Sequence, residues 1–593
     1  MDKPDNKEAD ICRNIKELYP QFFKPKKLIR DLVHGYIGLT SFDMDIIDTP
    51  HFQRLKDIRQ LTCQQVFPGA RHTRFEHSLG VLELTRQAIK HLNINGYLPP
   101  STNSSINPIC PKLEFNACMA ALLHDVGHCP FSHLGEEQFK IEDVCENLKQ
   151  SIILHLNGIS QDVINKIDEH KSSHEMLSCI ILLNIYHDKL ILCEFIDFEF
   201  IIRCILGIEY TRSPKKIENL LINLISSDSL DMDKLDYIMR DSLYTGISVP
   251  DIDTNRIFNN MFISDQGRLI FDCNAVPALQ NIIETRDNLY IWVYNHHAVV
   301  YTDFLYSYIM RRLMINYENI HGIKYTPSDN DPSWYGCLPN DLLFSVDAIE
   351  KRLVSDSDLN YYLKDQYRKS KEFHSQERKL DKKDRNMVER IAPLLKQLFE
   401  RQLLKPWWKT IFEYSNFMKA NFPDDNLRRN IPRKICDEKE KNQGSEFRSQ
   451  IAKAILNEFK ESKEGELCLK DGEIFIVQRS NKFYSLQSIS KITIYFKKNE
   501  ILNNTIIDDT TSQSGDYYTK YLTNIIPQRD YSTFFTKESF YIYIKRISGQ
   551  EKEARAFYEK VEKKFIEFST NLAKLSSAEF DEYADKMNRR EDD

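Results

Sequence analysis

The chain has 593 residues, more than one hydrophobic core normally serves, so we expect two or three domains. Hydrophobic residues make up 41% of the chain and charged residues 28%, a composition that excludes a globally disordered protein. The formal net charge of −7 gives no overall attraction to nucleic acid, so a dedicated DNA or RNA binder is not favoured.

The 13 cysteines are scattered and form no Cys-x-x-Cys pair, which indicates reduced thiols rather than disulfides or a zinc ribbon. The N-terminal residues are polar and contain no signal peptide. The most apolar stretch, residues 179–208, is interrupted by charges every few residues, which predicts two buried helices rather than a membrane span. We therefore expect an intracellular protein, cytoplasmic or nuclear, without membrane contact.

The spacing of apolar residues predicts a mostly α-helical fold with a smaller mixed α+β C-terminal region. In chain order we expect five parts: a helical lead-in at 1–26, a large helical domain at 27–318, a connector at 319–345, an α+β region at 346–550, and a C-terminal helix with a polar tail at 551–593.

Four short runs of β-branched and aromatic residues predict strands at 268–272, 474–477, 492–496 and 540–544. The stretch from Glu551 to Lys574 predicts an amphipathic charged helix. Two polar, charge-rich segments, 370–385 and 423–445, are interpreted as loops.

An adjacent pair, His124 and Asp125, ends a run of small and apolar residues. Gly127 and Pro130 follow and force a turn, which lets neighbouring helical residues share a ligand. Imidazole and carboxylate together suit a divalent metal.

The stretch around Asp233 is expected to be a helix with one polar and one apolar face. The polar face combines acids, a lysine and a tyrosine: Asp233, Lys234, Tyr237 and Asp241. The next arc is expected to face the core: Met232, Leu235, Ile238 and Met239. A solvated surface face is the alternative interpretation.

His77, then His124-Asp125, then Asp233 resembles the H…HD…D pattern of the HD phosphohydrolase superfamily. The flanking segments 48–55, 66–70 and 74–80 resemble the dNTP triphosphohydrolase branch, which includes bacterial dGTPases and the animal SAM-and-HD-domain dNTPase. The resemblance is strong over residues 27–300 and patchy beyond, and we expect no SAM domain before residue 27. Four ligands in order within matching flanks are a specific signal, unlike an isolated HD dipeptide.

The resemblance implies that His77, His124, Asp125 and Asp233 hold a divalent metal, which would be Mg, Mn, Fe or Zn. It also implies hydrolysis of a dNTP at the α-phosphorus, releasing a deoxynucleoside and inorganic triphosphate. By analogy with the family, such an enzyme lowers dNTP pools and thereby restricts viral DNA.

Three further histidines match family residues near the reacting phosphate: His128, His133 and His174. The resemblance implies that His128 or His133 protonates the leaving 5′ oxygen, since histidine titrates near neutral pH. For His174 a supporting role behind the ligands and a purely structural role are equally open.

The resemblance also implies a substrate site. Contacts to the triphosphate are expected from Arg74, Lys234 and Arg286, contacts to the sugar from Tyr237, Asp241 and Tyr294, and contacts to sugar and base from Gln60 and Leu61. On an α-helix, Arg286, Tyr290 and Tyr294 would share a face. Core packing is the alternative for the tyrosines.

The animal enzyme has an activator site for a guanine nucleotide, and three residues match it: Lys27, Asp48 and Gln53. Two positions depart from that pattern, since Lys56 stands in place of an expected arginine and Arg30 in place of an expected asparagine. Asp272 and Asn274 fall about where basic residues are expected near a second nucleotide site. A nucleotide effector is therefore a hypothesis. The family implies a homo-oligomer, from dimer to hexamer.

Two other functions remain open. One is an HD-type nuclease or a signalling-nucleotide hydrolase, for which the charged stretch 371–390 and Trp407-Trp408 leave room. The other is a non-catalytic nucleotide sensor, against which the complete set of metal ligands argues.

Overall fold

The computed structural model describes residues 20–98, 109–139, 141–156, 158–170, 172–211, 215–321, 343–374, 382–436, 443–459, 469, 473–479, 492–497, 513–514, 517–522, 525, 539–547 and 551–575. Most of the predicted lead-in, most of the connector, residues 375–381 and 437–442, and the polar tail from 576 lie outside the described residues. The predicted domain boundaries therefore stay predictions.

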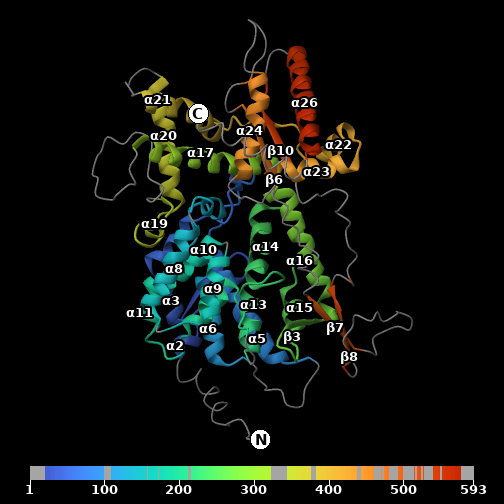
Figure 1. Cartoon of the computed structure of the whole chain (residues 1–593). Coiled ribbons are helices and arrows are strands. Elements are labelled where there is room, and N and C mark those ends of the chain that lie inside the picture. The colour runs from blue at the N-terminus through green and yellow to red at the C-terminus, as the bar shows by residue number, and fades with distance from the viewer. Residues whose placement is uncertain are drawn as a thin grey trace. The chain divides into compact units, whose positions relative to one another are not determined.

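The chain forms two compact units. The first comprises the described residues within Met1–Leu289, Pro339–Tyr361 and Tyr484–Gln528, and the second those within Tyr290–Leu338, Tyr362–Phe483 and Arg529–Asp593. The chain thus leaves the first unit and returns to it twice. Figure 1 shows the helices and strands of both units.

The first unit opens with the helix turn α2 (Pro20–Phe23) and an antiparallel hairpin of β1 (Lys27–Asp31) and β2 (Gly35–Leu39). The helical spacing predicted from residue 28 onward is wrong here, because β2 buries alternate residues, Ile37 and Leu39, rather than every third or fourth. Gly35 supplies the turn with a φ of 75°, which glycine adopts without steric cost.

Two short helices lead from the hairpin toward the core. Thr40 and Asp43 cap α3 (Ser41–Ile47) reciprocally, each side chain accepting the other's backbone N–H. Thr49 accepts the Phe52 N–H at the start of α4 (Pro50–Gln53). These caps fix the direction in which the chain enters the following 3-10 turn, residues 54–57.

Three helices form the centre of the first unit: α5 (Arg74–Asn95), α6 (Pro111–Leu123) and α14 (Met232–Thr245). The α5 helix packs against both α6 and α14, and α6 also packs against α12. The surrounding helices are α7 (His133–Glu136), α8 (Ile141–His155), α9 (Gln161–Glu169), α10 (Ser173–Ile181), α11 (His187–Leu190), α12 (Phe198–Leu206), α13 (Lys216–Ile225), α15 (Thr254–Asn259), α16 (Val276–Leu289) and α19 (Val346–Glu350).

A five-stranded sheet completes the first unit, in the order β3 (Met261–Ile263), β4 (Leu269–Asp272), β7 (Thr493–Lys497), β9 (Tyr517–Tyr521) and β8 (Gln513–Ser514). The β4–β7 pair is parallel, which requires a long connection, and the other pairs are antiparallel. A distant part of the chain therefore extends a sheet begun by β3 and β4.

The second unit combines helices with a three-stranded antiparallel sheet of β5 (Lys405–Pro406), β10 (Ser539–Ile544) and β6 (Ile474–Arg479). Its helices are α17 (His297–His321), α21 (Lys382–Phe399), α22 (Ile411–Asn421), α23 (Asp425–Ile435), α24 (Gln443–Glu458) and α26 (Glu551–Lys574). The α20 helix (Asp356–His374) begins in the first unit and ends in the second.

The predicted mostly helical fold with a mixed α+β C-terminal part is confirmed, as are all four predicted strands and the helix from Glu551. The two helices expected within residues 179–208 are present as the end of α10 and as α12, and a π-helical segment at 182–186 followed by the short α11 lies between them. The loop expected at 423–445 is wrong over α23, because Ile431 and Ile435 bury one helical face. None of the described helices has the length and apolar character needed to cross a membrane.

A buried ionic network joins the hairpin to α14. Arg240 is 0% exposed and donates to Asp236 at 2.8 Å and to Asp31 at 2.8 Å. Despite burial, the Arg240 guanidinium and the hydrogen bonds from His34 and His77 hold the pKa of Asp236 well below its usual range. Removing one partner from such a network leaves a buried charge uncompensated, which is strongly destabilising.

Gly80 on α5 leaves the space that this network fills. A Cβ atom at this position would lie 1.9 Å from Asp236 Oδ1 and 2.6 Å from a guanidinium nitrogen of Arg240. Those atoms cannot move aside cheaply, because both are bonded to several partners.

We therefore expect Gly80→Ala to destabilise the protein by roughly 3 kcal/mol or more, through overpacking and rupture of the network. Thermal unfolding measures this as a lower midpoint. The exposed Lys90→Ala on the same helix is the control, with an expected change within about 0.5 kcal/mol. Equal midpoints for the two variants would contradict the packing argument.

Candidate active site and metal centre

The predicted metal ligands come from three helices of the first unit. His77 lies in the first turn of α5, His124 and Asp125 directly follow α6, and Asp233 lies in the first turn of α14. The ligand atoms of His77, His124 and Asp233 all lie within 4.8 Å of one another. The packing of α5 against α6 and α14 thus brings together residues far apart in the sequence.

Both histidines of this group present Nε2 to it. His124 Nδ1 donates to the Ala121 carbonyl oxygen at 2.8 Å, and His77 Nδ1 bonds Asp236 Oδ2 at 2.7 Å. A carbonyl or carboxylate partner at Nδ1 fixes the tautomer and leaves the Nε2 lone pair facing the group. Both Nε2 atoms are buried without a hydrogen-bond partner, although His77 Nε2 lies 2.9 Å from Asp233 Oδ1.

Asp125 lies beside this group. Its Oδ1 is 3.5 Å from His124 Nε2 and its Oδ2 is 3.7 Å from His77 Nε2. Arg74 donates to Oδ2 at 2.7 Å. Although burial opposes ionisation, Arg74 and the surrounding histidines hold the pKa of Asp125 well below its usual range, so the carboxylate is charged.

The donor set fits a divalent cation. Burial disfavours a charged His77, but Asp233 and Asp236 outweigh it and raise the pKa of His77 to about 10. The carboxylates around His77 therefore favour a positive charge beside them. A bound metal ion would supply that charge while the His77 imidazole stays neutral. Two imidazoles with carboxylates suit Mn, Fe or Zn, and magnesium is compatible through the carboxylates.

A second histidine group lies next to Asp125. His128, His133, Glu136 and His174 bring their ligand atoms within 4.8 Å of one another. Glu136 Oε1 bonds His133 Nδ1 at 2.7 Å and lies 2.9 Å from His174 Nδ1. His128 and His174 stack with their ring centroids 4.3 Å apart.

These three histidines differ in environment. Burial, together with Arg74 and His174, holds the pKa of His128 well below its usual range, and both of its ring nitrogens are buried without a partner. Burial opposes a charged His174, but Glu136 outweighs it and raises the pKa of His174 to about 9. The His133 side chain is 69% exposed. The group thus combines a neutral, a protonated and a solvent-accessible imidazole.

The predicted substrate residues fall partly around these groups. Arg74 reaches both Asp125 and Ser132, and Lys234 Nζ bonds the Ser227 carbonyl and Asp231. Arg286 Nε donates to the Tyr237 hydroxyl at 3.4 Å. Asp241 is buried and pairs with His72 at 2.7 Å.

Two more predicted contacts come from the start of the unit. Gln60 is buried with its Oε1 unpaired, and Leu61 next to it is half-buried. Tyr294 belongs to the second unit and is the last residue of a π-helical segment, Tyr290–Tyr294. The α-helical spacing assumed for Arg286, Tyr290 and Tyr294 is therefore wrong, because α16 ends at Leu289.

The predicted effector residues lie at the edge of the same unit. Lys27 begins β1, Asp48 caps the end of α3, and Gln53 donates to the Ile47 carbonyl oxygen.

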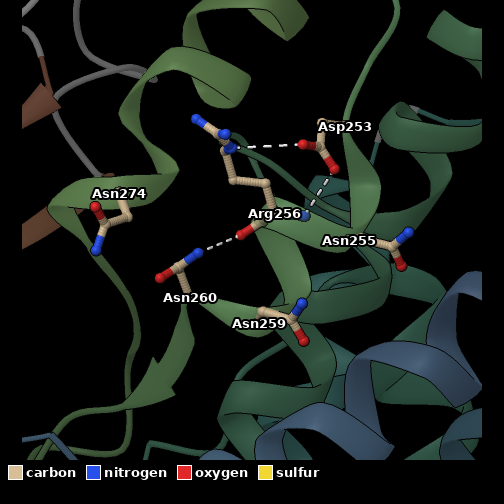
Figure 2. Close-up of a pocket in the computed structure, with 6 residues that line it drawn as sticks. All are labelled: Asp253, Asn255, Arg256, Asn259, Asn260 and Asn274. Atoms are coloured by element: carbon tan, nitrogen blue, oxygen red, sulfur yellow. Dashed lines mark hydrogen bonds and ion pairs between the residues drawn. The ribbon is translucent and has the colours of Figure 1, made fainter.

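A separate open polar pocket of about 450 Å³ is lined by Asp253, Asn255, Arg256, Asn259, Asn260 and Asn274 (Figure 2). Its one lining cation, Arg256, pairs with Asp253 at 3.4 Å. The predicted catalytic and metal residues do not line this pocket.

Sequence reasoning missed Asp236, His34 and Glu136. Asp236 is fully buried, and its second oxygen bonds His34 Nε2 at 2.6 Å, which joins the hairpin turn to His77. Two signals were available in the sequence. Asp236 and Arg240 have i, i+4 spacing, and His133 and Glu136 have i, i+3 spacing. Both spacings also suit an exposed helix face.

Asp236→Asn is expected to weaken metal binding by about 10- to 100-fold, because an amide no longer holds His77 in the ligating tautomer. Titration of the chelator-treated protein with Mn²⁺ measures the dissociation constant. Asp188→Asn is the control, since its side chain is 98% exposed. Unchanged affinity in Asp236→Asn would show that His77 is oriented by other contacts.

Comparison with known proteins adds the family. Residues 74–225 match the family model of the HD domain, a range that contains His77, His124 and Asp125 and ends before Asp233. A deoxynucleoside triphosphate triphosphohydrolase SAMHD1 homolog of Dictyostelium discoideum is 31% identical over 290 residues, 46% of this chain and 46% of that protein. A deoxynucleoside triphosphate triphosphohydrolase SAMHD1 of Bos taurus is 43% identical over 114 residues, 19% of this chain and 18% of that protein. The chain spans about half the length of the curated relatives it matches.

Solved structures show the fold over a larger part of the chain. A phosphohydrolase from Bacteroides thetaiotaomicron has a TM-score of 0.53 and 20% identity, covering 88% of this chain and 100% of that one. A hypothetical protein from Aquifex aeolicus has a TM-score of 0.50 and 18% identity, covering 91% of this chain and 99% of that one. The HD-domain match over residues 74–225 and the histidine–aspartate group on three packed helices make this part of the chain similar to metal-dependent HD domains.

Proposed function

We propose that this protein hydrolyses deoxynucleoside triphosphates to a deoxynucleoside and inorganic triphosphate. The observation that carries the proposal is the buried group in which the Nε2 atoms of His77 and His124 meet the carboxylate of Asp233, with Asp125 beside them. Relatives that bear the name deoxynucleoside triphosphate triphosphohydrolase share about a third of the aligned residues and support the choice of substrate.

In the proposed reaction, the oxygen of a water molecule bonds to the α-phosphorus and the bond from that phosphorus to the 5′ oxygen breaks. The triphosphate leaves with the water oxygen, and the 5′ oxygen takes up a proton. When bound by His77, His124, Asp125 and Asp233, a divalent cation would supply charge that neutralises phosphate oxygens and acidifies water.

The second histidine group supports the proton transfer. His133 is exposed and bonded to Glu136, so it is the better candidate for the proton donor to the 5′ oxygen. His128 is held neutral, which suits a hydrogen bond to a phosphate oxygen or to the attacking water. His174 is held protonated by Glu136, which suits a contact to a negatively charged phosphate.

The remaining site residues keep the roles proposed from the resemblance. Arg74, Lys234 and Arg286 would neutralise the triphosphate, and Tyr237, Asp241 and Tyr294 would line the sugar. Gln60 carries a buried unpaired Oε1, which suits a donor on the sugar or base. Lys27, Asp48 and Gln53 remain candidates for a nucleotide effector, and a homo-oligomer remains a proposal.

A nuclease function of this protein is less well supported. Trp408, one of two tryptophans considered for stacking on bases, is 2% exposed and donates to the Phe540 carbonyl oxygen at 3.0 Å. It packs against Phe417 with ring centroids 4.9 Å apart, within the core of the second unit. A base could not stack on it without opening that core.

The first test is an ion-exchange product assay with each dNTP singly and in mixture, in the presence of Mg²⁺ or Mn²⁺. We expect deoxynucleoside and intact triphosphate in equal amounts from the wild type. Asp125→Ala should lower kcat by about 1,000-fold or more, because the ligand set loses a carboxylate. Turnover only in mixtures would indicate an activator, and cleavage of single-stranded DNA without dNTP turnover would replace the proposal with a nuclease.

A second test addresses the proton donor. Glu136→Gln is expected to lower kcat by about 10- to 100-fold, because His133 and His174 lose the carboxylate that both imidazoles contact. Metal content should stay at the wild-type level, since Glu136 belongs to the second group. The neighbouring exposed Glu137→Gln is the matched control. Equal kcat values for the two variants would remove Glu136 from the mechanism.

A further inference from the structure

The loop between α6 and α7 carries His128 and delivers His133, and its backbone is strained. Phe131 has a φ of 59° and Ser132 a φ of 53°, the left-handed region that side chains with a Cβ rarely adopt. Ser132 has a ψ of −133°, a combination that glycine normally supplies. Such backbone persists only where surrounding contacts hold it.

The contact that holds it comes from a residue 225 positions away. Asp356, at the start of α20, accepts the Phe131 N–H at 2.7 Å through Oδ1 and the Arg59 N–H at 3.1 Å through Oδ2. Asp356 is 2% exposed. Its two oxygens therefore bridge the strained loop and the segment that leads into α5.

Ser132 extends the bridge to the metal group. Its hydroxyl donates to the Arg59 carbonyl oxygen at 2.5 Å and accepts from Arg74 Nε at 3.1 Å. Arg74 in turn donates to Asp125 at 2.7 Å. The backbone that Asp356 holds is thus connected to Asp125 through the side chains of Ser132 and Arg74.

Arg54 ties the other end of the loop to the same distant segment. One guanidinium nitrogen donates to the Val126 and His128 carbonyl oxygens at 3.1 Å and 2.7 Å, and the other donates to Val354 at 2.8 Å. Val354 lies two residues before Asp356. The loop is therefore held on both sides of Cys129 and Pro130 by contacts shared with residues 354–356.

The segment itself is anchored beside the loop. The Ser355 hydroxyl donates to Asp57 at 2.6 Å, and the Ser357 N–H donates to the same oxygen at 3.2 Å. Burial raises the pKa of Asp356 to about 6, against the opposing effect of the two backbone N–H groups. At pH 7.5 the carboxyl is therefore mostly ionised, and both oxygens accept.

We infer that Asp356 is a positioning residue for the reaction proposed above: it holds Phe131 and Ser132 in place and so sets His128 and His133 relative to Asp125. This inference rests on the proposed function. The segment that contains Asp356 is then part of the active-site scaffold, although it follows the first part of the second unit along the chain. The residues that match the HD domain do not form the whole scaffold by themselves.

The test compares Asp356→Asn with Asp347→Asn in the full-length protein. The asparagine keeps the shape of the side chain but accepts only one of the two N–H groups, because its amide nitrogen is a donor. Asp347 is the matched control, since it lies in the same segment, is 61% exposed and pairs with Lys351. Both variants remove one negative charge.

For Asp356→Asn we expect kcat to fall by about tenfold or more, with KM and metal content near the wild-type values, because misplaced catalytic groups slow chemistry without removing ligands. Hydrogen exchange should become faster in peptides that cover residues 126–139. Asp347→Asn should match the wild type in both readouts. A wild-type kcat and wild-type exchange in Asp356→Asn would overturn the inference.

A double-mutant cycle with Ser132→Gly separates positioning from general loss of stability. Glycine adopts the backbone angles of residue 132 without strain, so it relieves part of the need for Asp356. We expect the two effects on kcat to be less than multiplicative, and multiplicative effects would refute action through this backbone. If the wild type cleaves no dNTP, the proposed function fails, and unchanged exchange in Asp356→Asn then also refutes the positioning role.

Discussion

The buried carboxylate of Asp236 constrains the rest of the site. It accepts from His34 on the hairpin, His77 on α5 and Arg240 on its own helix, and it is 0% exposed. Burying a carboxylate costs free energy unless its oxygen atoms accept hydrogen bonds, so the three donors to Asp236 must be present together. Gly80 allows α5 to approach closely enough, and the orientation of His77 follows from that approach.

Around this constraint the two histidine groups have opposite electrostatic character. Near His77 the carboxylates outnumber the cations, and the imidazole is stabilised with a positive charge. Near His128, burial together with the cations Arg74 and His174 lowers the pKa of the imidazole, which stays neutral. Asp125 lies between the groups, with Arg74 on one oxygen. In the proposed reaction, metal binding and proton transfer would therefore fall to separate sets of residues.

The family and the site support different levels of conclusion. The HD domain accounts for the helices that carry His77, His124 and Asp125, whereas an HD fold by itself serves many substrates. The choice of a dNTP depends on the residues that line the sugar and base. The pocket of Figure 2 is lined mainly by asparagines, and its charged lining residues are Asp253 and Arg256, so it offers little net charge to a ligand.

The amino-acid sequence predicted the order of the candidate metal ligands, the mostly helical class, the four strands and the last helix, because these follow from local spacing and residue type. It did not predict the β1–β2 hairpin or α23, where short runs fit more than one period. Tertiary structure alone decided the partners of the ligands. His34 meets Asp236 across 202 positions and Phe131 meets Asp356 across 225, and local periodicity carries no information about contacts made by folding distant segments together.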